Sequence, residues 1–160
     1  MEIFRNNGII GAILDEYEKA LNELDESIAN LSNENLIKIV DFETTNSDCK
    51  SIQTILTHLI RSGYCYALEI RKSLGERVDF PIRKLFNTVP EYQMELKRMF
   101  EFNEKLFEDY PNLKIEETED QLKILTNWNQ KYDVEQLFEH AIVHILKHRR
   151  QINRFKQRLN

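Results

Sequence analysis

The chain has 160 residues, about the size of one compact domain, so we expect a single domain over residues 1–160. Its formal net charge of −5 argues against a general nucleic-acid-binding protein, which needs a basic surface. We find neither a secretory signal nor an apolar stretch of about 20 residues that could cross a bilayer. Two cysteines, Cys49 and Cys65, form no CxxC pair. We therefore expect a cytoplasmic protein that binds neither nucleic acid nor membrane.

The first half of the chain predicts two long helices. Apolar residues recur at alternating intervals of four and three over residues 9–31, the pattern of a helix that packs in a bundle. Residues 36–40 are expected to form a short helical turn. A second long helix should begin at Ser47 or Asp48 and end near residue 74, because Gly75 is a suitable C-cap. Gly63, in the middle of this helix, indicates a close helix contact or access for a ligand.

The second half predicts two more long helices. Pro90 suits the first turn of one helix, which should end at about residue 110 because Pro111 follows. Within residues 112–132, the segment 122–126 is either a short extended piece or a helical turn. Trp128 and Tyr132 are expected to be packing residues, with a place at a pocket mouth as the alternative. Asp133 then caps a helix that runs to the C-terminus. Four long amphipathic helices predict an all-α four-helix bundle.

Three of the four histidines follow one another at intervals of four residues in the last predicted helix: His140, His144 and His148. At about 100° per residue, His148 lies inside the apolar seam, His144 lies at its edge and His140 lies at the boundary with solvent. Two histidines at i and i+4 can bind one metal ion, because their rings are one helical turn apart. The alternative interpretation is that these histidines are hydrogen-bonded core residues that bind no metal.

A third metal ligand must come from another helix or from solvent. His140 and His148 are about 12 Å apart along the axis, too far to share an ion. His58 is the only remaining histidine, and it flanks the apolar seam of the second long helix. Three histidines would leave open positions on a divalent ion, which is typical of a catalytic site. Imidazole ligands suit zinc, nickel, iron or copper.

The motifs around these histidines resemble those of the DinB/YfiT-like superfamily. That family ends its last helix with a histidine, three residues, a second histidine and then Arg-x-Gln, which resembles residues 144–152, HILKHRRQI. The family's other ligand histidine lies in the second helix before a leucine, as His58 does here. Two positions depart from the pattern: Arg150 replaces the usual glycine, and Lys147 replaces the usual histidine. These departures leave the ligands intact and change the expected rim of the pocket.

The resemblance implies a four-helix bundle of the DinB/YfiT-like type, commonly a homodimer, with a divalent metal ion held by His58, His144 and His148. It also implies a metal-dependent hydrolase or a low-molecular-weight thiol transferase, with a small-molecule thiol or amide as substrate. We expect the ion to be zinc, nickel or iron. A non-catalytic dimeric bundle that binds a metal or a small ligand is the alternative function.

Other polar residues are weaker candidates for the site. Gln151 could support a metal ligand from outside, and His140 and Cys65 could line a pocket. Cys65 has no evident activating partner, so we interpret it as a small buried residue. Glu69 and Glu139 could act as a general base, but both are expected to be solvated charges.

Overall fold

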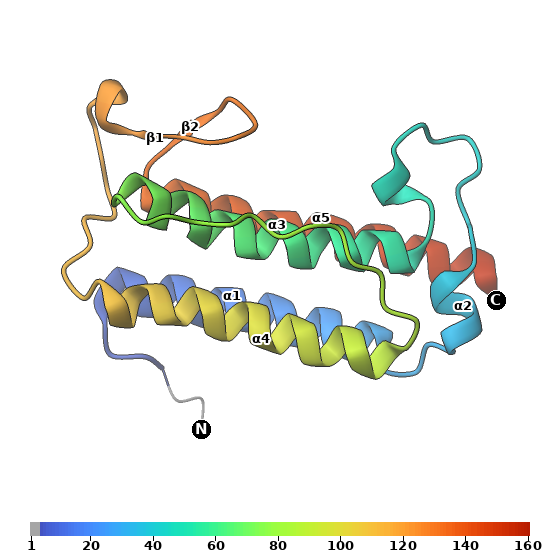
Figure 1. The fold of residues 1–160 in the computed structure, drawn as a ribbon. Helices are drawn as coiled ribbons and strands as arrows, with labels where there is room; N and C mark the ends of the chain where they lie inside the picture. Colours follow the sequence, from blue (N-terminus) through green and yellow to red (C-terminus); the bar gives the residue numbers. More distant parts are fainter. Residues whose placement is uncertain (1–3) are drawn as a thin grey trace.

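The structure is a computed structural model that describes residues 4–160, and it is mostly helical, as the sequence predicts. Four long helices lie side by side (Figure 1): α1 (Gly8–Ile28), α3 (Ile52–Ser73), α4 (Val89–Asp109) and α5 (Val134–Leu159). Each long helix packs against two others, since α3 contacts α4 and α5, and α1 contacts the same two. Shorter elements occupy the connections: α2 (Asn33–Ile37), the 3-10 turns η1 (Ser47–Cys49) and η2 (Asp120–Leu122), and the strands β1 (Ile124–Leu125) and β2 (Lys131–Tyr132).

Local capping sets where the long helices begin. Asp133 caps α5 as predicted, accepting the Gln136 N–H at 2.8 Å. The predicted start of α3 at Ser47 or Asp48 is wrong, because Ser51 is the cap and accepts the Thr54 N–H at 3.1 Å. The Thr54 hydroxyl accepts the Ser51 N–H in return, which satisfies two donors at the helix start. The chain before Ser51 is therefore free to form the separate turn η1.

The apolar seams meet in one core between the long helices. The predicted seam of α1 is buried over most of its length: Ile10, Leu14, Tyr17, Leu21, Leu24 and Ile28. At Gly63 in α3, a side chain would collide with the sulfur of Met99 in α4. Gly63 thus serves the close helix contact that its position predicted. Among the helices of residues 4–160, none combines the length and the apolar character that crossing a membrane requires.

A small β-hairpin covers one end of α3 and α5. Its strands pair antiparallel, with Ile124 opposite Tyr132 and Leu125 opposite Lys131. Asn129 takes a left-handed conformation, φ 63°, in the connecting loop. The extended alternative for residues 122–126 is thus correct for Ile124 and Leu125. The hairpin brings Trp128 and Tyr132 beside the helices that carry the histidines.

The close contact at Gly63 gives a stability prediction. Gly63→Val should lower the free energy of unfolding by about 2 kcal/mol, because the new side chain overlaps the buried Met99. Chemical denaturation measures the change. In a Met99→Ala background the same substitution should cost less, since the space is then open. An equal cost in both backgrounds would contradict the contact.

Candidate metal centre

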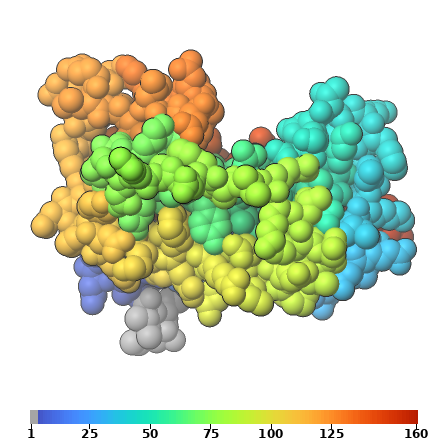
Figure 2. Space-filling view, in the orientation of Figure 1, coloured from blue at the N-terminus to red at the C-terminus, as the bar shows by residue number. Residues whose placement is uncertain are grey.

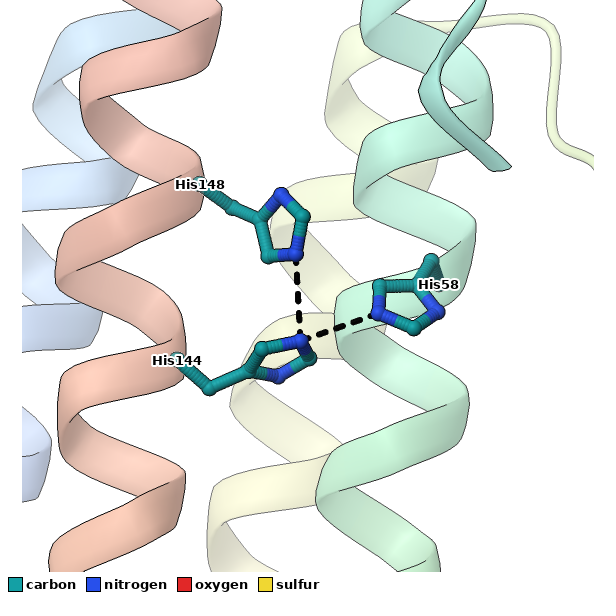
Figure 3. A group of neighbouring side chains, drawn as sticks. All are labelled: His58, His144 and His148. Carbon is teal, nitrogen blue, oxygen red and sulfur yellow. Dashed lines mark hydrogen bonds between the residues drawn. The ribbon is translucent and has the colours of Figure 1, made fainter. Parts of the chain in front are cut away.

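His58 of α3 meets His144 and His148 of α5 where the two helices pack together (Figure 3). The Nε2 atom of His144 lies 2.9 Å from Nε2 of His58 and 3.1 Å from Nε2 of His148. His148 is buried, whereas the other two histidines are partly buried. The three residues predicted as metal ligands are thus brought together from two helices.

The outer nitrogen of each ring faces an oxygen atom. Nδ1 of His148 lies 2.9 Å from Oε1 of Gln151, and Nδ1 of His144 lies 3.1 Å from the Tyr66 hydroxyl. Nδ1 of His58 makes a longer contact, 3.4 Å, with the carboxylate of Asp48. Partners of this kind fix the tautomer and the orientation of metal-binding histidines. Gln151 contacts the metal-ligand candidate His148 from outside, as expected from the sequence.

Asp48 and Tyr66 were not predicted as partners. Asp48 was expected to be a helix cap, and it reaches His58 only because η1 folds back against α3. Tyr66 is a buried residue of α3. It follows His58 by eight residues, so the helical period places both on one face, and that spacing could have identified it.

Each of these oxygen atoms can accept a proton from the ring nitrogen that it faces. An acceptor at each Nδ1 favours a proton there, which leaves three Nε2 lone pairs pointing toward one another. A hydrogen-bonded alternative would place the His144 proton on Nε2. The Nε2–H group of His144 would then face the Nε2 atoms of both His58 and His148, and it could donate a well-aligned hydrogen bond to only one of them. A cation between the rings satisfies all three lone pairs.

The separations suit one divalent ion. A metal bonded to imidazole nitrogens at about 2.0–2.1 Å sets neighbouring ligand atoms about 2.9–3.4 Å apart, for bond angles between 90° and tetrahedral. The Nε2 separations of 2.9 and 3.1 Å fall within that range, and all three ligand atoms lie within 4.8 Å of one another. His58, His144 and His148 are therefore close enough together to share one ion.

Burial keeps the three histidines neutral. It lowers the pKa of His144 to about 2, with repulsion from the neighbouring His148 and His58 as the next causes. Burial also lowers the pKa of His148 to about 4, against the opposing effect of its Gln151 hydrogen bond. The pKa of His58 is lowered by burial and partly restored by Asp48. Neutral imidazole is the form that binds a metal ion.

A hollow opens beside the histidines, between the hairpin and the η1 region (Figure 2). Its volume is about 580 Å³, and both His58 and His144 line it. His140 also lines the hollow and is exposed, with its ring stacked on that of Trp128 at 6.4 Å. Cys65 lines the same hollow and is half-buried, and burial raises the pKa of its thiol. Of the two interpretations of Cys65, a pocket-lining residue fits this position better than a small buried one.

The structure also corrects two other interpretations. Glu139 is exposed, as expected, but Glu69 is buried and only 1% exposed. It is buried because the hairpin folds over it: Oε1 of Glu69 accepts the Asn127 N–H at 2.8 Å. Trp128 is 38% exposed and lines the hollow together with Tyr132. The pocket-mouth alternative for these two aromatic residues is therefore the better one.

No protein-family model, curated protein or solved structure matches the chain.

The lowered histidine pKa values predict that protons compete weakly with the metal. A histidine of pKa 6.5 loses about 25-fold in metal affinity between pH 7 and pH 5, and three such residues lose about 10⁴-fold. Zinc affinity here should fall by less than about 25-fold over this interval, as measured by competition with a chelator. A loss of 10³-fold or more would refute this.

The same pKa values predict how the metal-free fold responds to acid. The unfolded chain takes up protons on histidine below about pH 6.5, whereas the buried imidazoles do not. The free energy of unfolding should therefore decline as the pH falls from 6.5 toward 4. Denaturation curves of metal-free wild type and His148→Ala protein test this, since the variant should show a shallower decline.

The contact between Glu69 and the hairpin can be tested through the single tryptophan of the chain. Glu69→Ala removes the acceptor of the Asn127 N–H, so that amide should exchange about tenfold faster with solvent. The Trp128 emission should shift to longer wavelength as the hairpin loosens. Glu69→Gln keeps an acceptor and should resemble wild type, while Glu139→Ala serves as the exposed control.

Proposed function

We propose that the chain binds one divalent metal ion through Nε2 of His58, His144 and His148. One observation carries the proposal: three imidazole nitrogens converge while each outer nitrogen faces its own oxygen atom. Imidazole donors favour zinc, nickel or iron over magnesium or calcium. Three protein ligands also leave room for a water or a substrate atom.

The residues around the ion have separate tasks in this proposal. Asp48, Tyr66 and Gln151 orient the three imidazoles and keep their protons on the outer nitrogens. The hollow gives a small molecule access to the His58 and His144 side of the site. A divalent ion held there would lower the pKa of a bound water or thiol and so supply a nucleophile at neutral pH.

We further propose that the protein is a cytoplasmic homodimer of the DinB/YfiT-like type that acts as a metal-dependent hydrolase or thiol transferase. The order of the four long helices supports this assignment, as does the placement of one ligand on the second long helix and two on the last. Gln151 in contact with His148 agrees with the motif that carries the resemblance. Thiol or amide compounds are the substrates to be screened first.

A non-catalytic binding module is the second candidate function. Two carboxylates line the hollow, and both are engaged elsewhere. Asp48 contacts His58 and Arg83, and Glu69 accepts the Asn127 N–H through Oε1, while its Oε2 is buried and lies 3.9 Å from the Lys72 ammonium. Neither of them is placed as a free general base. This observation favours a site that binds a metal and a ligand without turnover.

Metal content measured by mass spectrometry tests the proposed centre. Untagged wild-type protein should carry about one divalent ion per chain after incubation with zinc or nickel. His148→Ala should lose most of it, because two imidazoles bind far more weakly than three. His140→Ala is the matched control on the same helix and should keep the ion. Wild type that stays metal-free, or a His148→Ala protein that keeps full occupancy, would refute the centre.

A further inference from the structure

The hollow beside the histidines is large enough to hold a small organic molecule. Its volume of about 580 Å³ lies within the usual range for ligand pockets. Residues of α3 line its length, from His58 at one end to Glu69 three turns later. A ligand in the hollow would therefore lie along α3 with one end close to the histidines.

Aromatic rings form the wall on the hairpin side. The ring of Trp128 lies 5.9 Å from that of Tyr66 and 6.2 Å from that of Tyr132. Phe80, from the segment between α3 and α4, lines the hollow as well. The partial exposure of Trp128, 38%, leaves apolar surface that a flat group could cover. Such a wall favours an aromatic or other planar apolar group.

Arg61 supplies a positive charge at the same hollow. It is exposed, and it follows His58 by three residues on α3, so both side chains lie on one face of the helix. Its Nε donates to the carbonyl of Pro81 at 3.2 Å. Within residues 4–160 the guanidinium forms no ion pair. Its remaining N–H groups are available to a planar anion.

We propose that this hollow binds a small aromatic carboxylate, with its ring against Trp128 and Tyr132 and its carboxylate on Arg61. The carboxylate would then lie beside the histidine end of the hollow. The inference deepens the proposed metal function, because it identifies the chemical class of molecule that the centre would meet.

The charges around the hollow favour a carboxylate over a phosphate. Asp48 and Glu69 line the same hollow and offset a single arginine. A phosphate carries about −1.5 to −2 charges at neutral pH, so these two residues would repel it more strongly than a singly charged carboxylate. The bidentate fork of arginine matches the planar carboxylate.

Calorimetric titration of the full chain with phenylacetate tests the inference. Acetate has the same charge without the ring, and 2-phenylethanol has the ring without the charge. Phenylacetate should bind at least tenfold more tightly than either control compound, in the zinc-loaded and in the metal-free protein. Phenyl phosphate should bind more weakly than phenylacetate.

Two substitutions locate the contacts. Arg61→Gln should weaken phenylacetate binding about five- to tenfold and leave 2-phenylethanol unchanged, as expected for one exposed charged contact. Trp128→Ala should weaken both compounds by a similar factor. Arg98→Gln, on α4 and outside the hollow, is the matched control and should bind like wild type. All variants should keep the metal content of wild type.

The outcomes separate this inference from the proposed metal centre. If acetate binds as tightly as phenylacetate, or if Arg61→Gln leaves phenylacetate binding unchanged, the inference is wrong while the metal centre can stand. If the protein takes up no metal but the metal-free chain binds phenylacetate through Arg61, the proposed function fails and the ligand class is retained.

Discussion

Three imidazole nitrogens meet where α3 lies against α5, and unprotonated ring nitrogens this close repel one another unless a proton or a metal ion lies between them. The Nε2 atom of His144 has both neighbours within 3.1 Å. The surroundings of the three rings favour neutral imidazoles with their Nε2 atoms free to bind a metal ion. Burial favours the uncharged rings, and Asp48, Tyr66 and Gln151 hold the outer nitrogens. The bundle therefore presents a preformed set of donors to a divalent ion.

The rest of the fold serves to keep α3 and α5 in register at this point. Ser51 and Asp133 fix where the two helices begin, which sets the height of each histidine along its helix. Gly63 lets α4 approach α3 closely on another side, through the contact with Met99. Glu69 ties the hairpin to the surface of α3 near the same site. These caps and contacts are each local, but together they position α3 and α5 and so the Nε2 atoms of the three histidines.

The site divides into a buried part and an open part. His148 and Gln151 lie on the inner side, where burial and a hydrogen bond fix the metal-binding ring. The open part is the hollow, with an aromatic wall and one exposed arginine. Its two carboxylates hold other groups of the protein rather than pointing freely at a substrate. The hollow therefore offers contacts for a bound ligand, but its carboxylates already contact protein groups.

The sequence by itself determined the features that depend on short-range spacing. The i, i+4 relation of His144 and His148, the apolar seams of the long helices and the Asp133 cap all follow from the helical period and local hydrogen bonding. It also singled out His58, because no other histidine was left to complete the set.

Only the tertiary structure decided which distant segments meet. Asp48 reaches His58 because η1 folds back, and Glu69 is buried because the hairpin covers it. Trp128 lines a hollow because the same hairpin projects beside α5. The physical reason is that helical periodicity fixes the direction of a side chain on its own helix. What that side chain meets depends on long-range packing, which no local pattern encodes.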